Sequence, residues 1–382
     1  MWPPEPPASE PVEVPALFVR HPAARWGLLT LLSLLVLSAV PLSGVTTAGT
    51  LKEGYTDHVR HPYVVWVGLH RGLQALYTAP LGELREGIPY RQAIDQWLDV
   101  PYVYPPGALV LFLPLALVGE WVPMSPQAFG QVCLLYLLAF AHVALYAALR
   151  LLDGLPAGGR WAVGVLCWLV LMRLALYGQY DGAWLVCGVL ALAALAKDRP
   201  GVALRWLACA ALLHYRAVVL VAVGVVALWR VVRGRPVRQW PWGTLLGVAV
   251  AGVLCVRTFL WMAPLAAQTD AATPSILGEP GTVALVMGLS AAVLALSWRG
   301  ADGLVTASVG LGVVLAVIDT RHWWHASALL LVPLTVGVLR APRWPTAVRL
   351  GLVVWAGVLE MAVWYGNPLW LFRDLNRFLR LM

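Results

Sequence analysis

One arginine and two histidines lie close together between two long apolar runs near the carboxyl-terminal end of the chain, in the stretch 319–325 (DTRHWWH). His322 and His325 are three residues apart, so they share one face if the stretch is helical. Arg321 carries a planar guanidinium that matches the oxygen atoms of a phosphate group. These residues predict a phosphate-binding site. A metal site is the weaker alternative, because two histidines with Asp319 form only a minimal ligand set.

A second polar group lies in the segment 43–106, where the stretch 55–61 reads YTDHVRH. Asp57 is next to His58 and close to Arg60. Neighbouring cations favour the ionised form of a carboxylate, and an ionised carboxylate can act as a general base. The alternative is a solvated loop charge, and the local sequence leaves both interpretations open.

A short polar stretch at 177–181 (YGQYD) separates two apolar runs. Gly178 permits close approach of the backbone to a ligand, and Gln179 and Asp181 offer directional hydrogen bonds to a sugar. An ordinary turn, with Asp181 capping the following helix, explains the same residues.

Another polar stretch, His214-Tyr215-Arg216, interrupts a long apolar run. An arginine at membrane depth costs about 2.5–3.5 kcal/mol unless it faces water or an anion. Arg216 therefore either serves a ligand or extends its guanidinium to the membrane interface. Four further polar residues in apolar runs are isolated, and we expect them to pack between helices or to reach the interface: His142, Arg173, Arg257 and Glu360.

The composition requires a membrane around these residues. Of the 382 residues, 60% are hydrophobic and only 12% are charged, whereas soluble domains have about 25% charged residues. The net charge of +8 comes from arginines that cluster in short segments between apolar runs, so it reflects membrane topology and not nucleic-acid binding. The five cysteines form no CxxC pair, and neither a disulfide framework nor a zinc site is expected.

The apolar runs predict an all-α, polytopic bundle of about ten to twelve membrane helices. Several runs have nearer 16 residues than the usual ~20, which predicts broken or tilted helices. The runs are 26–42, 107–122, 127–148, 161–176, 182–196, 202–229, 243–263, 282–298, 304–318, 326–339 and 347–364.

Basic loops face the cytoplasm in membrane proteins. This rule places the arginines of 199–205, 230–238, 299 and 340–349 inside and all the polar stretches above on the extracytoplasmic face. The run 202–229 must then cross twice and turn outside near His214. Arg150 and Arg160 conflict with two full crossings between 106 and 150, so we expect 107–122 to cross incompletely.

The chain is expected to form one membrane domain, 19–366, between two short ends. Residues 1–18 are rich in proline and glutamate and predict a disordered cytoplasmic tail. Residues 43–106 form the first extracytoplasmic loop, whose apolar residues at helical spacing predict short helices on the membrane surface. Residues 367–382 predict an interfacial amphipathic helix.

The order of these motifs resembles the GT-C class of membrane glycosyltransferases, and is most similar to bacterial polyprenyl-phosphate-mannose-dependent alpha-1,2-mannosyltransferases. The resemblance spans most of the chain, although each motif is short. Where such enzymes often have a lysine followed by proline, this chain has His214-Tyr215-Arg216. The matching motifs are Asp57, Gly87 to Tyr90, Tyr102 to Pro106, Gly178-Gln179 and His322 to Pro333.

The resemblance implies an integral protein of the bacterial inner (plasma) membrane with its active site on the extracytoplasmic face. A sugar, mannose by analogy, would pass from a polyprenyl-phosphate donor to a glycan or glycolipid acceptor, with membrane lipids around the site. Asp57 would be the base of a single inverting displacement, and no metal or other cofactor would be required. The donor phosphate would be held by Arg321, His322, His325, His214, Arg216 and Arg60. The sugar or acceptor would contact Tyr104, Gln179, Asp181 and His58.

Two other functions are compatible with polar groups in a membrane cavity. The first is a transporter or flippase of lipid-linked sugars, although no inverted repeat is visible in the sequence. The second is an inactive scaffold with the same fold. The sequence lacks three motifs that would indicate other functions. They are a GxxxxGK phosphate-binding loop for ATP-driven transport, a GxGxxG motif for dinucleotide binding and a GxSxG motif for hydrolysis.

Overall fold

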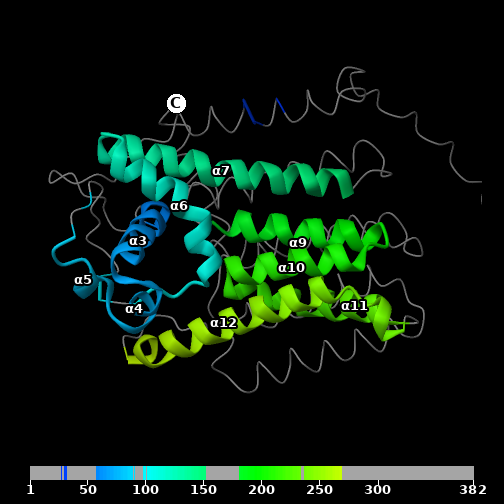
Figure 1. Cartoon of the computed structure of the whole chain (residues 1–382). Coiled ribbons are helices and arrows are strands. Elements are labelled where there is room, and N and C mark those ends of the chain that lie inside the picture. Colours follow the sequence, from blue (N-terminus) through cyan, green and yellow to red (C-terminus); the bar gives the residue numbers. More distant parts are fainter. Residues whose placement is uncertain are drawn as a thin grey trace, which may run out of the picture.

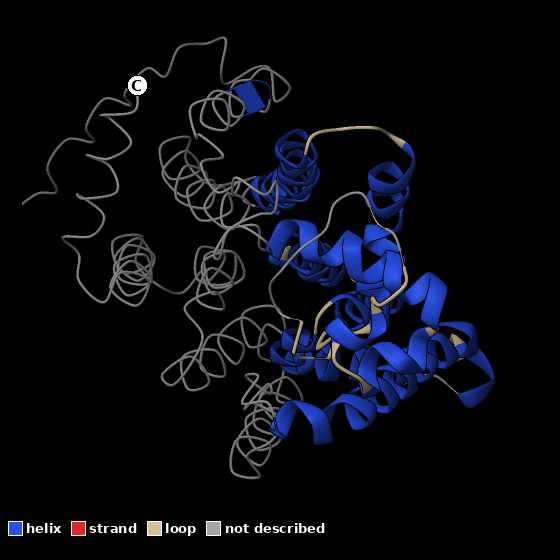
Figure 2. Ribbon diagram, turned by 90° about the vertical axis from the view of Figure 1, so that its left-hand side faces the viewer, coloured by secondary structure: helices blue, strands red, loops and turns tan. Residues whose placement is uncertain are grey.

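A computed structural model of the chain describes residues 57–88, 90, 98–99, 101–151, 180–233 and 236–268, together with 27, 30 and 31. In this part of the chain every regular element is a helix and there is no strand, which confirms the expected all-α class there (Figure 2). The longer helices are α3 (Asp57–Arg71), α6 (Pro106–Trp121), α7 (Pro126–Leu151), α9 (Asp181–Ala196), α10 (Pro200–Leu213), α11 (Val221–Val232) and α12 (Trp242–Gln268). The shorter elements are α4 (Leu73–Thr78), α5 (Leu81–Leu84), η1 (Tyr215–Leu220) and η2 (Val237–Gln239).

The longest helices lie side by side in a row (Figure 1). Helix α9 packs between α7 and α10, and α10 packs in turn against α11 and α12. Helices α3 to α6 gather at one end of this row, where α3 packs against α6 and α4 packs against α12. Residues before position 122 therefore cover the ends of helices that follow much later in the sequence.

Helices α9 and α10 form an antiparallel pair with two chemically different ends. At the first end, the Tyr180 hydroxyl, just before α9, donates a hydrogen bond to the carbonyl oxygen of Leu213 at 2.8 Å. At the other end, the Arg230 guanidinium of α11 lies 3.4 Å from the carbonyl oxygen of Leu195 and 3.9 Å from the Asp198 carboxylate. The predicted turn at His214 is present, because α10 ends there and η1 leads back into α11.

Several of these helices are short, as the lengths of the apolar runs predicted. Helix α6 has 16 residues and contains Pro114. At 1.5 Å per residue it rises about 24 Å, less than the ~30 Å hydrocarbon core of a bilayer. Helix α10 has 14 residues. The 24-residue segment Trp242–Leu265 of α12 is the one described helix that is long and apolar enough, by length and composition, to cross a membrane.

Most of α3 belongs to the protein interior. Its apolar residues recur at helical spacing, and Val59, Val64 and Val67 are at most 1% exposed. The helix is therefore present where the sequence predicted helices in the first loop, and its packing against α6 and α7 is deeper than that of a helix resting on a surface. The expected tail 1–18, the runs after 269 and the helix 367–382 lie outside the described residues.

Candidate functional site

A group of rings fills the space where the first end of the α9–α10 pair meets α3 and α6. We call it the aromatic–histidine cluster. Its members are brought from four separate parts of the chain. They are His61, Tyr102, Tyr104, Phe112, Tyr180, Trp184 and His214.

His61 of α3 is at the centre of the cluster and is 3% exposed. Its ring stacks on Phe112, with centroids 4.7 Å apart and an interplanar angle of 13°. The edges of Tyr104 and Tyr180 meet it at 4.8 and 4.6 Å. The Tyr102 hydroxyl lies 3.5 Å from His61 Nδ1. These contacts fix the position of the imidazole within the cluster.

His214 forms a second polar centre at the opposite side of the cluster. It caps the end of α10 with an extended backbone (φ −152°, ψ 134°), which turns its ring away from the helix. The buried ring lies 5.3 Å from that of Tyr104 and 5.4 Å from that of Tyr180. Tyr104 and Tyr180 thus contact both histidines and connect them.

A cation is enclosed beside the rings. Arg60 of α3 is 3% exposed, and its Cζ lies 5.8 Å from the centroid of the Tyr104 ring. A buried guanidinium is costly unless polar or charged groups compensate it. Asp57 begins α3 three residues before Arg60 and four before His61, so helical geometry places these positions on the same face.

The segment that carries Tyr104 is held by α4. The Tyr77 hydroxyl donates to the carbonyl oxygen of Tyr104 at 2.6 Å, and the amide of Tyr102 donates to the carbonyl oxygen of Leu76 at 2.9 Å. Burial raises the pKa of Tyr77 and of Tyr102 far above the ordinary value, so both hydroxyls stay protonated at neutral pH. Helix α4 therefore supports the cluster, and the Tyr77 ring contacts its edge at Tyr102, with centroids 5.8 Å apart.

A glycine allows α6 to approach α10 closely enough to close the cluster. A Cβ atom added at Gly107 would lie 2.6 Å from the carbonyl oxygen of Leu212 and 2.8 Å from its carbonyl carbon. Both are backbone atoms, so no side-chain rotation can make room. Because Gly107 follows Tyr104 by three residues and Leu212 precedes His214 by two, this contact sets the distance between the two rings.

Three residues predicted from the sequence come together here: Arg60, Tyr104 and His214. Asp57 and His58 begin α3, Asp181 begins α9 directly after Tyr180, and Arg216 lies in η1. For these four residues the structure describes the backbone, which is helical, and not the side chain. Four predicted residues lie outside the described residues: Gln179, Arg321, His322 and His325.

The prediction missed the residue at the centre of the cluster. His61 follows Asp57 by four residues, so helical spacing within the 55–61 stretch could have identified it. Tyr180 and Trp184 were also missed, since nothing in their local sequence indicates which ring they contact. Two of the four isolated polar residues, His142 and Arg257, pack within the described helices as expected, whereas Arg173 and Glu360 lie outside the described residues. His142 Nδ1 bonds the Leu138 carbonyl oxygen within α7, and the Arg257 guanidinium lies 4.6 Å from the Trp261 ring.

Within the described part of the chain, no group of three or more histidine, cysteine, aspartate or glutamate side chains is placed to hold a metal ion. A comparison with models of protein families finds no match, and comparisons with curated proteins and with solved structures find no relative. The candidate site must therefore be interpreted from its own chemistry. It combines a buried cation, two fixed imidazoles and several aromatic faces.

Proposed function

We propose that this protein is a multi-pass membrane glycosyltransferase of the GT-C type, which transfers a sugar from a polyprenyl-phosphate donor to a glycan or glycolipid acceptor. The observation that carries the proposal is the convergence of four polar sequence motifs at one end of the helix row. They are the stretches that contain Arg60, Tyr104, Tyr180 and His214. Polar groups inside a membrane protein mark functional sites by default, because their burial is expensive.

The position of the cluster supports an extracytoplasmic site. The opposite end of the α9–α10 pair carries Lys197, Arg199 and Arg230, and Arg238 follows in η2. Under the positive-inside rule, a basic end faces the cytoplasm. The aromatic–histidine cluster is then directed toward the outer face of the bacterial plasma membrane, where lipid-linked sugar donors and envelope acceptors meet.

In the proposed reaction, Asp57 removes the proton of an acceptor hydroxyl as that oxygen attacks the anomeric carbon of the donor sugar. The new glycosidic bond forms as the bond between the anomeric carbon and the phosphate oxygen breaks. The electron pair leaves with the polyprenyl phosphate, and the anomeric configuration inverts. A positioned general base is worth about 10²–10⁴-fold in rate. The place of Asp57 on the same face of α3 as Arg60 and His61 fits this role.

Cations stabilise the negative charge on the leaving phosphate in this mechanism. Arg60 and His214 are the described candidates, because both are buried next to Tyr104. Arg216, Arg321, His322 and His325 are assigned to the same phosphate. The rings of Tyr104 and Tyr180 supply apolar faces for the sugar, and His58, Gln179 and Asp181 supply hydrogen bonds.

The test is transfer of radiolabelled mannose from polyprenyl-phosphate-mannose to membrane acceptors by the purified full chain in lipid nanodiscs. We expect transfer by the wild type, and a loss of at least about 100-fold in Asp57→Asn, in line with the loss of a general base. His322→Ala should weaken donor binding as well as transfer. Asp198→Asn is the matched control, because Asp198 is an exposed carboxylate at the basic end of the row.

The same experiment separates the proposal from its rivals. If folded wild-type protein transfers no mannose, glucose or arabinose from lipid donors, the transferase proposal is wrong. Movement of the lipid-linked sugar across a vesicle membrane without transfer, at equal rates in wild type and Asp57→Asn, would identify a flippase instead.

A further inference from the structure

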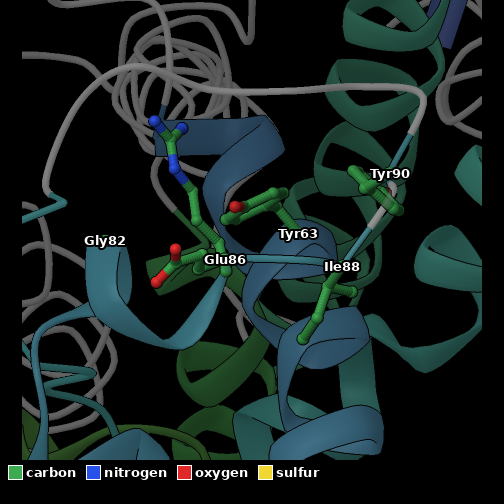
Figure 3. Close-up of a pocket in the computed structure, with 6 residues that line it drawn as sticks. Tyr63, Gly82, Glu86, Ile88 and Tyr90 are labelled. Atoms are coloured by element: carbon green, nitrogen blue, oxygen red, sulfur yellow. The ribbon is translucent and has the colours of Figure 1, made fainter.

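A cavity lies beside α3, and none of the residues that line it belongs to the aromatic–histidine cluster. It has a volume of about 400 Å³, within the range of small-molecule sites. It is lined by Tyr63, Gly82, Arg85, Glu86, Ile88 and Tyr90. In Figure 3, Tyr63 is in the centre, with Glu86 on one side and Ile88 and Tyr90 on the other.

Two aromatic side chains line the cavity, Tyr63 of α3 and Tyr90. Trp66 and His70, which do not line it, follow Tyr63 at helical spacing on the same face of α3. The ring of Tyr90 lies 5.4 Å from that of Tyr63 and 4.8 Å from that of Trp66. Burial raises the pKa of Tyr63 and of Tyr90, so both phenols remain neutral at physiological pH. Neutral tyrosines combine an apolar face with a hydroxyl that both donates and accepts hydrogen bonds.

The charged wall of the cavity is fixed before any ligand binds. Arg71 of α3 donates to the carbonyl oxygens of Leu84, at 2.9 Å, and of Glu86. The turn closes with a bond from the Ile88 amide to the Arg85 carbonyl oxygen at 3.0 Å. Gly87 has φ +68°, a conformation that favours glycine. A turn anchored in this way holds Arg85 and Glu86 in place, so little ordering is needed on binding.

The charges of this wall indicate the kind of ligand. Arg85 forms a hydrogen bond with the Tyr63 hydroxyl, and Glu86 follows it directly in the chain. One cation and one carboxylate side by side favour neither an anion nor a cation. They do offer donors and acceptors for adjacent hydroxyl groups, and the tyrosine rings offer faces for the C–H side of a sugar ring.

We propose that this cavity is a carbohydrate-binding subsite for a neutral sugar unit, separate from the aromatic–histidine cluster. Its assignment to the acceptor glycan rests on the proposed transferase function, whereas the binding of a sugar does not. Helix α3 then contributes to both sites, with His61 on one face and Tyr63, two residues further along the helix, on the opposite face.

The test is direct binding of a soluble disaccharide to the full chain in nanodiscs, measured by saturation-transfer NMR and calorimetry. Mannobiose, maltose and arabinobiose are the probes, with inorganic phosphate as the anionic comparison. We expect at least one disaccharide to bind with a roughly millimolar or better Kd. Arg85→Gln and Glu86→Gln should each weaken that binding by about tenfold, as for the loss of a good hydrogen bond.

Two control variants make the result specific. Glu83→Gln changes an exposed carboxylate of α5 that does not line the cavity, and Arg205→Gln changes an exposed cation of α10. Both should bind the disaccharide as the wild type does. The proposal is overturned if no disaccharide binds, if phosphate binds in its place, or if Glu83→Gln and Glu86→Gln have equal effects.

The outcome also separates this proposal from the proposed function. His214→Phe should retain disaccharide binding and lose transfer, because His214 lies in the cluster and not in the cavity. If no sugar transfer is found but disaccharide binding depends on Arg85 and Glu86, the transferase proposal fails and the subsite stands. If transfer is found without such binding, the subsite is wrong.

Discussion

The two ends of the α9–α10 pair differ in how they accommodate positive charge. At the basic end, Arg199 and Arg205 are exposed, and Arg230 pairs at 3.9 Å with an Asp198 side chain that is 90% exposed. At the cluster end, Arg60 is 3% exposed and lies among aromatic rings. Exposed ion pairs contribute about 0–1 kcal/mol, whereas buried cations are expensive to keep.

The difference in burial separates two groups of arginines that require different explanations. Under the proposed topology, the positive-inside rule alone accounts for the exposed arginines, since any cation at that end satisfies it. The buried arginine is explained by a ligand or by a specific partner. Substitutions at the two ends should therefore differ in their effects on both stability and transfer.

The largest effect is expected for Arg60→Ala. Removing this side chain leaves a cavity in a packed region and abolishes the contact with the Tyr104 ring, so unfolding should become easier by about 2–4 kcal/mol. Transfer should be lost. Arg238→Ala, at an exposed position of the basic end, should stay within about 0.5 kcal/mol of the wild type. Thermal unfolding in nanodiscs measures the stability of both variants. Equal decreases in melting temperature for Arg60→Ala and Arg238→Ala would contradict the proposed difference between the two ends.

The next largest effect on stability is expected for alanine substitutions of two glycines, Gly107 at the cluster end of the α9–α10 pair and Gly201 at its basic end. Gly107→Ala forces a Cβ atom against the backbone of Leu212, and overpacking of this kind costs about 1–3 kcal/mol. Gly201→Ala, at the start of α10, meets no atom within 4 Å. It should stabilise the helix by about 0.5–1 kcal/mol. Melting temperatures that move in opposite directions would support the tight α6–α10 contact, and a neutral Gly107→Ala would contradict it.

His214→Phe should reduce sugar transfer with little change in the stability of the fold. Phenylalanine preserves a ring next to Tyr104 and Tyr180, so stability should change by less than about 1.5 kcal/mol. Transfer should nevertheless fall by at least tenfold, because the ring can no longer donate a proton to the donor phosphate. The control is His142→Phe, which alters an equally buried histidine of α7 outside the cluster. Unchanged transfer in His214→Phe would exclude this histidine from the site.

The smallest effect appears at high pH. Burial raises the pKa of Tyr102 far above 10, so above pH 10 the unfolded chain loses this proton while the folded chain retains it. Stability is thus fully present below pH 10 and falls above it, by about 1.4 kcal/mol per pH unit for one such tyrosine. Tyr102→Phe should flatten the decline between pH 10 and 11. Denaturation curves at several pH values measure the slope.

Local patterns in the sequence predicted several features that the structure contains. The break at His214 follows from the length of the run 202–229 together with its basic borders. The helices of the first loop follow from apolar residues at helical spacing. Helical spacing from Asp57 could have indicated His61, but its contacts with Phe112 and Tyr180 could not be predicted, because they arise only through the packing of α6 and α9. No prediction was made for Arg85 and Glu86, because the contacts of Arg71 that hold their turn join residues 13 and 15 positions apart in the sequence.

Helix α3 borders both of the proposed sites. Tyr63 borders the cavity and His61 is two residues away in the cluster, so a shift of this helix changes the dimensions of both at once. Any change in affinity at one site that a ligand at the other produces must be matched by an equal change in the reverse direction. Under the two proposals, α3 would be the element through which a sugar unit in the cavity changes the affinity for the donor, and through which the donor changes the affinity for the sugar.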